Sequence, residues 1–525
     1  MRRHATRGSF TLVFGLLLAG CLGAGVDPAA TEPDASHDAA LAWVERALLN
    51  AEDHDHLDPA QHVGLSTPNF EVVGWDPLVT DHMGSQAGGY FCGDVETKDG
   101  RALAVVHSFT SDVAFVLIDV TDPAKPTKIG ELVMEHTHVW DVAMTPDQRH
   151  VLLATSPYGD LDKALGANLP ARGGGVWFRD ACTGTTRALA GPEAAAPYHS
   201  GVALVDITDP RAPAVTDFRP LPVAGGHSIV AQDVGGETIA LVTANHPGAP
   251  NYYGFLEILD SPIGAKLDTR SVYHTDPAAS ARDGLSALFG NHDGYLQVHP
   301  ITGDRLAYLA DGNLGVAILD IEDTRMPRFV SRWDDAASIA NTDFEHFAHS
   351  VLPIDTTWEG RHYTFVSEEC AGRPTDTPSC LVYVLDTTDP AAPTLAGAWT
   401  IPVDLGGWAY PGFSPHYMAV IDRTLFVAHW HAGLWAFDVS SADAIADLAP
   451  VGVFVPDRDT GYEPDGGFTD QYNQRPVVAD VLAHGENVIA FDGTSGVYVL
   501  RFDATRPMPA PTPWPLRLDG IGVRT

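Results

Sequence analysis

Five histidines in this chain each begin a short apolar stretch that is typical of a β-strand. They are His138, His227, His292, His349 and His416. Neutral imidazole is a ligand for copper, iron and zinc, so several imidazoles gathered at one point predict a transition-metal site. These residues are far apart in the sequence. The elements that carry them must therefore bring them together.

One phrase recurs along the chain, an apolar strand that ends in Asp and leads into a Pro-containing turn. Its copies span residues 116–123, 203–210, 317–323 and 383–390, with weaker forms at 256–260, 435–439 and 498–502. Each copy lies among four short apolar strands. Seven such units predict an all-β fold, a seven-bladed β-propeller of four-stranded blades. An array of β-sandwiches is the alternative, but sandwiches do not repeat one motif so closely.

The seventh unit lacks a convincing fourth strand after Phe502. Residues 69–75 precede the first unit and read as a strand, so we expect this N-terminal strand to close the ring and protect its edges. The predicted propeller domain spans residues 69–509. Residues 21–68 form a predicted linker with a short helix, and residues 510–525 form a C-terminal tail.

In a propeller the first strand of every blade lines the axis, so the five histidines should meet at one mouth of the channel. The links between second and third strands emerge at the same mouth. They contain His107, His246, Asp311, Glu368, Glu369, His429, His431 and Asp492. The predicted metal ligands are the five histidines together with His429 and His431. Alternatively, a histidine that recurs at one repeat position hydrogen-bonds the backbone of the neighbouring blade.

The N-terminus has the pattern of an export signal. Arg2, Arg3 and Arg7 precede an apolar run at residues 10–18, which is too short to span a bilayer. The sequence Leu18-Ala19-Gly20-Cys21 that ends it resembles the lipobox of prokaryotic lipoproteins. That resemblance implies a signal peptide at residues 1–20, a lipidated Cys21, and a protein anchored to the membrane outside the cytoplasm. A secretory signal followed by an incidental cysteine is the alternative.

Four further cysteines permit disulfides in an exported protein. Cys370 and Cys380 flank a turn-rich loop that a bridge could close, and Cys92 and Cys182 are then left as the second pair. The chain has 31 Lys and Arg against 68 Asp and Glu, a net charge of −37. This acidic balance excludes nucleic acid as a partner, because phosphate binding needs basic side chains.

Two segments remain open to interpretation. Carboxylates alternate over residues 457–463 as in a calcium loop, although the full EF-hand register is absent. This segment is therefore compatible with a calcium site or with a solvated loop. The insertion at residues 157–199 is long enough to be a lid over one face or a surface loop.

The repeated phrase resembles the LVIVD-repeat family of exported prokaryotic propellers, and this resemblance implies a fold and a location. Two seven-bladed families carry axial histidines: carotenoid oxygenases bind iron, and selenium-binding proteins resembling methanethiol oxidases bind copper. Residues 429–438 are loosely similar to the latter. The sequence therefore predicts a monomeric module that holds a protein, glycan or small-molecule ligand. A copper- or iron-dependent oxidoreductase is the alternative, and whether the protein is an enzyme stays open.

Overall fold

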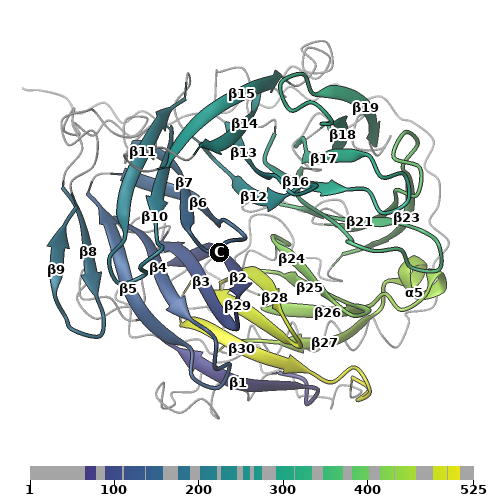
Figure 1. The fold of residues 1–525 in the computed structure, drawn as a ribbon. Helices are drawn as coiled ribbons and strands as arrows, with labels where there is room; N and C mark the ends of the chain where they lie inside the picture. Colours follow the sequence, from purple (N-terminus) through teal and green to yellow (C-terminus); the bar gives the residue numbers. More distant parts are fainter. Residues whose placement is uncertain are drawn as a thin grey trace, which may run out of the picture. The chain divides into compact units, whose positions relative to one another are not determined.

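The protein is described by a computed structural model (Figure 1). It describes residues 66–78, 89–108, 112–135, 137–157, 175–189, 201–221, 226–244, 252–259, 265–274, 291–312, 314–333, 347–369, 381–400, 414–430, 432–456, 477–493 and 495–508. All of these residues lie in one compact unit, Ala35–Thr525. No helix among them is long and apolar enough to cross a membrane.

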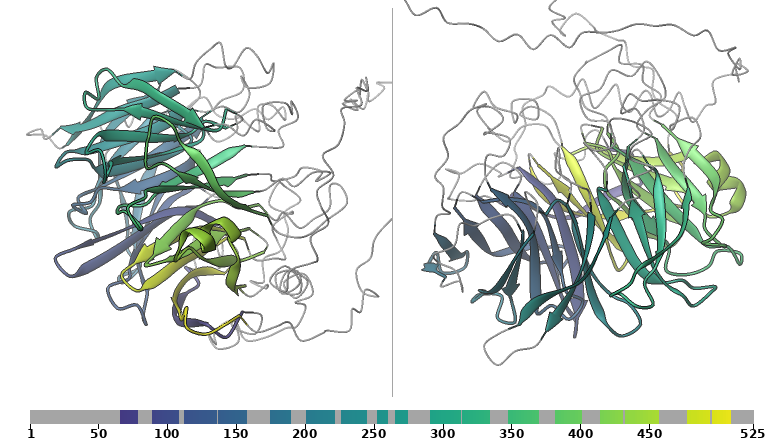
Figure 2. Two further views of the ribbon diagram at one scale, coloured as in Figure 1. Left: turned by 90° about the vertical axis from the view of Figure 1, so that its right-hand side faces the viewer. Right: turned by 90° about the horizontal axis from the view of Figure 1, so that it is seen from above.

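Seven antiparallel sheets follow one another around a ring (Figures 1 and 2), which confirms the predicted propeller. The first blade contains β2 (Tyr90–Lys98), β3 (Arg101–Ser108), β4 (Val113–Asp119) and β5 (Thr127–Met134). The second contains β6 (Thr137–Met144), β7 (His150–Pro157), β10 (Gly201–Asp206) and β11 (Ala214–Pro220). The third contains β12 (Ile229–Asp233), β13 (Thr238–Ala244), β14 (Tyr252–Leu259) and β15 (Lys266–His274).

The remaining blades follow the same order from the axis outward. The fourth contains β16 (Asp293–Val298), β17 (Arg305–Ala310), β18 (Val316–Asp320) and β19 (Arg328–Trp333). The fifth contains β20 (Ala348–Pro353), β21 (Tyr363–Glu368), β22 (Val382–Asp386) and β23 (Thr394–Trp399). The sixth contains β24 (Met418–Ile421), β25 (Thr424–Ala428), β26 (Leu434–Asp438) and β27 (Pro450–Phe454), with a short helix, α5 (Ala442–Asp447), before β27. The seventh contains β28 (Val478–His484), β29 (Asn487–Asp492), β30 (Gly496–Phe502) and β1 (Phe70–Asp76).

The ring is closed by the N-terminal strand, as the sequence predicts. Strand β1 pairs antiparallel with β30, and Phe70 lies opposite Phe502. Close packing against the first blade also requires a glycine in β1, because a Cβ atom on Gly74 would lie 2.2 Å from the carbonyl oxygen of Pro123. The two ends of the propeller therefore meet within one sheet.

The repeated phrase encodes the end of the third strand in a blade. Asp119 Oδ1 accepts a hydrogen bond from the backbone N–H of Thr121, and Asp122 Oδ1 accepts one from that of Ala124. Such turns suit Asp because its short side chain can bond the backbone two residues further on. The same pair of turns occurs at Asp206 and Asp209, Asp320 and Asp323, and Asp386 and Asp389.

Part of the long insertion in the second blade forms a hairpin of β8 (Val176–Asp180) and β9 (Thr186–Ala188). Strand β8 pairs with β5, the outermost strand of the first blade, so that sheet has six strands. The described part of the insertion thus extends the outer edge of a blade and is not a lid over the channel.

The core of the described residues is divided among the blades. Seven clusters of buried apolar side chains lie between neighbouring sheets, one at each interface. The packing between blades fixes the seven first strands around the axis, and the residues at their starts face one another there.

Candidate metal centre

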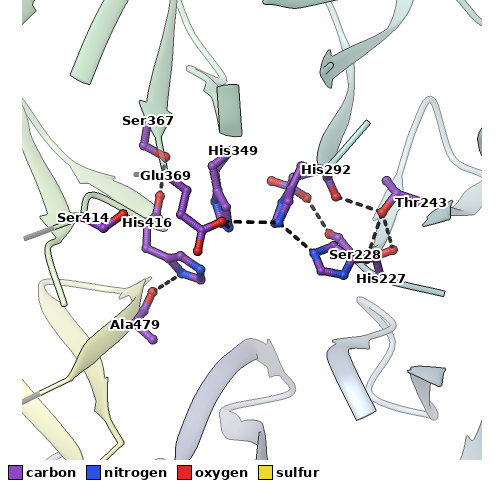
Figure 3. A network of polar contacts seen from close by, with 12 residues as sticks. His227, Ser228, Thr243, His292, His349, Ser367, Glu369, Ser414, His416 and Ala479 are labelled. Carbon is purple, nitrogen blue, oxygen red and sulfur yellow. Dashed lines mark hydrogen bonds and ion pairs between the residues drawn. The ribbon is translucent and has the colours of Figure 1, made fainter. Parts of the chain in front are cut away.

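Four of the five predicted axial histidines lie side by side at one end of the channel (Figure 3). The Nε2 atoms of His227 and His292 are 2.7 Å apart. The ring of His349 lies 3.8 Å from that of His292 and 3.9 Å from that of His416, centroid to centroid. We call His227, His292, His349 and His416 the axial histidine belt. They come from four successive blades, as the repeat predicts.

Strand pairing sets the position of the belt in each blade. The backbone N–H of His227 donates to the carbonyl of Thr243, and that of His292 donates to Ala310. The N–H of His416 donates in the same way to Ala428. Each of these histidines is therefore held at the mouth by the second strand of its own blade.

His138 lies outside the belt, because Trp140, two residues later, occupies the axial position of its blade. The register shift that spans Trp140, between Val139 and Asp141, also spans His349, between Ala348 and Ser350, so Trp140 and His349 are equivalent. The Trp140 ring lies 4.9 Å from that of His227, and the His138 ring packs edge-on against Trp140 at 4.4 Å. The predicted alignment of this blade with the others was therefore wrong by two residues.

The first and seventh blades complete the ring without a histidine. Phe91 of the first blade meets His416 edge-on, with ring centroids 5.1 Å apart. In the seventh blade the backbone carbonyl of Ala479 accepts a 2.7 Å hydrogen bond from His416 Nδ1. This bond fixes the tautomer of His416, because Nδ1 carries the proton and Nε2 keeps its lone pair.

Glu369 joins the belt from the link that follows β21. Its Oε2 atom lies 3.9 Å from His292 Nε2 and 3.8 Å from His349 Nε2. Among the described residues these three form a group whose ligand atoms all lie within 4.8 Å of one another. The sequence places Glu369 at this mouth but gives no sign that it, rather than its neighbours, reaches the histidines.

The other acidic residues predicted at the mouth are engaged elsewhere. Asp311 Oδ2 lies 2.7 Å from Arg332 Nη1, and Glu368 accepts a hydrogen bond from the N–H of Leu381. Asp492 accepts a bond from the N–H of Val477. These carboxylates brace loops at the mouth, and Glu369 is the one that faces the belt.

Burial keeps the belt imidazoles neutral. Desolvation lowers the pKa of His227 to about 4 and that of His416 to about 3. The pKa values of His292 and His349 lie well below 6.5, first because of burial and then because neighbouring histidines repel a second charge. A metal ion needs the neutral form, which is the form that burial favours.

One further predicted ligand, His429, stands apart from the belt. His429 is fully buried, but its ring packs at 5.7 Å against Trp399 at the end of the outermost strand of the fifth blade. It thus lies between the fifth and sixth blades. His431 lies outside the described residues, as do Cys21, Cys370, Cys380, His246 and residues 457–463.

The predicted pairing of Cys92 with Cys182 is wrong. Both thiols are free: Cys92 is buried on β2 near the axis, and Cys182 is exposed in the turn between β8 and β9. The blade repeat places these positions far apart, since the β8–β9 hairpin is on the outer edge of its sheet.

One residue further along the first strands, buried carboxyl groups join neighbouring blades. Asp141 Oδ2 accepts a 2.9 Å bond from the N–H of Ile229, and Asp480 Oδ2 accepts a 2.7 Å bond from that of Gly93. Ser228 Oγ lies 3.0 Å from Asp141 Oδ2 and 2.9 Å from Asp293 Oδ1. The Ser228 hydroxyl can donate a hydrogen bond to only one of these two carboxyl groups. The other contact is a hydrogen bond only if that carboxyl group is protonated and donates to the hydroxyl oxygen.

Protonation of an acid in this layer agrees with its burial. Desolvation raises the pKa of Asp293 to about 7, and it raises the pKa values of Asp141 and Asp480 well above 3.8. These side chains hold the blades together beneath the belt. The sequence analysis did not identify them.

Below the belt the axis opens into a cavity of about 500 Å³. Asp293, Ser350 and Tyr417 line its inner end, each directly after a belt histidine in the sequence. Its size is within the range of small-molecule sites in proteins.

No protein-family model and no curated protein matches this sequence. Solved structures similar to the chain include the β-propeller domain of Cps50 (Swd1) from Myceliophteria thermophila and Sqt1 from Saccharomyces cerevisiae. The first has a TM-score of 0.40 and 10% identity, and the match covers 80% of this chain and 98% of that one. The second has a TM-score of 0.42 and 10% identity, with 79% and 96% covered. Neither similarity bears on what the axial site does, and membership of the LVIVD-repeat family stays a prediction.

Proposed function

We propose that this propeller binds a transition-metal ion in the axial histidine belt, with His292, His349 and Glu369 as the primary ligands. One observation carries the proposal. Two buried imidazoles and a carboxylate from three separate segments present their ligand atoms within 4.8 Å of one another. Their residue types match the sets of two histidines and one carboxylate that hold zinc or non-haem iron.

The donor set fits a metal ion in a further respect. His349 is fully buried, yet its Nε2 atom has no hydrogen-bond partner among the described residues. A buried polar atom without a partner is costly unless a ligand satisfies it. The other ring nitrogen, Nδ1, lies 2.6 Å from Ser350 Oγ, so the ring is oriented with Nε2 toward Glu369. A contact of this kind orients a ligating histidine.

The spacing is close to that of a bound site. With bonds of about 2.0–2.2 Å, ligand atoms around a tetrahedral ion lie about 3.3–3.6 Å apart. The 3.8 and 3.9 Å contacts of Glu369 are a few tenths of an ångström wider than this. His227 and His416 flank the triad and are candidates for a fourth ligand.

The nitrogen and oxygen donors favour zinc, iron or copper(II). Cys92 does not belong to the group of ligand atoms, and burial raises the pKa of its thiol, so it stays protonated and unsuited to soft metals. When bound, such an ion supplies Lewis-acid or one-electron chemistry. The protein itself supplies two neutral imidazoles and a carboxylate, and it holds them in a fixed orientation with the imidazoles buried.

The metal test compares two double variants of protein made without a His-tag. His292→Ala with His349→Ala removes two ligands. His274→Ala with His484→Ala removes two histidines away from the belt, one at the end of the outermost strand β15 and one at the end of β28 opposite to the belt. Elemental analysis after loading with Zn²⁺, Cu²⁺ or Fe²⁺ should give one ion per chain for the parent and the control, and none for the ligand variant. Equal metal content in both variants, or none in the parent, refutes the proposal.

We also propose that the protein acts outside the cytoplasm as a lipid-anchored module that holds a protein, glycan or small molecule. The support is the apolar run at residues 10–18 and the lipobox-like ending at Cys21. A Cys21→Ser variant expressed in a lipoprotein-processing host should leave the membrane fraction. If it stays there as firmly as the parent, the anchor is wrong.

A second candidate function is metal-dependent oxidation of a small molecule. The observation that favours it is the cavity of about 500 Å³ that reaches the belt at Ser350 and Asp293. Copper- or iron-loaded parent protein should then consume oxygen with a member of a panel of thiols, phenols and amines. The His292→Ala, His349→Ala variant should not. If the protein takes up metal but consumes no oxygen with any of these compounds, the oxidation proposal is wrong and the binding-module proposal stands.

A further inference from the structure

The lining of the cavity below the axial histidine belt holds acidic residues and no basic ones. First strands from all seven blades contribute to its wall. Seven of its lining residues are acidic, and none is lysine, arginine or histidine. The acidic residues are Asp94, Glu96, Asp141, Asp293, Asp355, Asp422 and Asp480. The side chains of Asp355 and Asp422 are exposed and mark the outer end, away from the belt.

The inner end of this acidic channel is in direct contact with the belt. Ser350 lines the cavity, and its Oγ atom lies 2.6 Å from Nδ1 of His349. On the opposite side of that ring, the unpartnered Nε2 atom of His349 faces Glu369 (Figure 3). One imidazole therefore separates the channel from the group of ligand atoms.

Aromatic rings also pack against the belt. Trp140 lies 4.9 Å from His227, Phe347 lies 5.5 Å from His292, and Phe91 lies 5.1 Å from His416, centroid to centroid. The carboxyl groups of Asp311, Glu368 and Asp492 at the mouth are engaged with other groups, so Glu369 is the acid that faces the belt from that side, whereas the channel side holds several acids.

We propose that the acidic channel is the route by which a divalent cation enters the axial site. This inference rests on the proposed function, because the route needs a metal site at its inner end. A cleft of one charge with low-dielectric walls focuses its field and raises the local concentration of the opposite ion. The channel fits a small hydrated cation and repels anions, so it also selects by charge what reaches the belt.

Asp94 and Glu96 have no counter-charge among the residues that line the channel. Burial raises the pKa of Asp94 to about 6. Burial and the nearby charges of Asp94 and Asp147 raise the pKa of Glu96 to about 8, so Glu96 carries little charge at neutral pH. The test therefore uses the exposed carboxyl groups at the outer end, Asp355 and Asp422. Replacing them should leave the fold intact while it weakens the attraction for a cation.

The experiment measures Co²⁺ uptake by stopped-flow absorbance at low salt. The channel variant carries Asp355→Asn with Asp422→Asn, two exposed residues of the channel wall. The control carries Glu486→Gln with Asp503→Asn, whose side chains are 75% and 44% exposed on the seventh blade. Both variants change the net charge equally, so a general effect of charge appears in both.

The proposal expects the association rate of the channel variant to fall about tenfold below that of the control. Its dissociation rate should fall by the same factor, and its equilibrium Kd should stay within about twofold of the parent. Added salt should remove most of the difference. Equal association rates in the two variants overturn the route. A weaker Kd with an unchanged association rate also overturns it, because the carboxylates would then hold the ion. A parent that takes up no Co²⁺ shows instead that the proposed function is wrong.

Discussion

Replacing Phe70 by alanine should open the ring at its closure. Phe70 is the first residue of β1, and its side chain is only 4% exposed. Its ring centroid lies 4.8 Å from that of Phe502, 6.1 Å from Phe454 and 6.2 Å from Phe426. These partners belong to the sixth and seventh blades, so one side chain connects the N-terminal strand to both.

The expected loss follows from this burial. Removing a buried phenylalanine ring costs about 3–5 kcal/mol, as lost transfer free energy and as the cavity left behind. Strand β1 has no neighbour on its outer side within its sheet, so little can close over the gap. A typical protein is stable by about 5–15 kcal/mol, so the change removes a large share of the total.

The measurement is urea denaturation followed by tryptophan fluorescence, with hydrogen exchange of the β30 amides as a local readout. Phe329→Ala is the matched control, because Phe329 on β19 is 54% exposed and its loss should cost less than about 0.5 kcal/mol. Denaturation midpoints that coincide for the two variants would refute the closure argument. Unchanged protection of β30 in the Phe70 variant would do the same.

Three further outcomes are expected. Burial lowers the pKa of His362 to about 4 in the folded protein, whereas the pKa of this histidine in the unfolded chain is about 6.5. The contribution of neutral His362 to the free energy of unfolding is therefore complete above pH 6.5 and is lost as the pH falls toward 4. Relative to a His362→Gln variant, the parent should therefore lose about 2 kcal/mol between pH 7.5 and pH 5 in paired denaturation curves, and a constant difference would contradict this. In the native protein a thiol reagent should label Cys182 and not Cys92 in peptide maps; equal labelling would show that the burial of Cys92 is wrong. Asp480→Ala should lower the free energy of unfolding by about 2 kcal/mol or more, because the N–H of Gly93 loses its acceptor, while Asp480→Asn should lose less; equal losses would argue against the hydrogen bond.

The fold was predictable because its signals are local and repeated. Apolar strands that end in Asp119, Asp206 and equivalent residues form turns through their own side chains, and each copy strengthens the same interpretation. The closing strand was predictable because the last blade lacked a fourth strand in the sequence, and residues 69–75 supplied one. These features depend on neighbours within a few residues or on a simple count.

The site was only partly predictable for the opposite reason. The repeat placed His227, His292, His349 and His416 at one mouth, but in the second blade Trp140, and not His138, occupies the equivalent position. The sequence pattern does not decide which of these two residues lies at the axis.

Residue types and their periodic order along the chain determined the propeller, its closure and the gathering of imidazoles at the axis. Only the tertiary structure decided that Glu369 reaches His292 and His349 while Asp311 and Asp492 are engaged elsewhere. It alone also decided that burial holds the belt neutral. The physical reason is that contacts and desolvation depend on groups brought together from different blades. Those groups are separated by tens to hundreds of residues in the sequence.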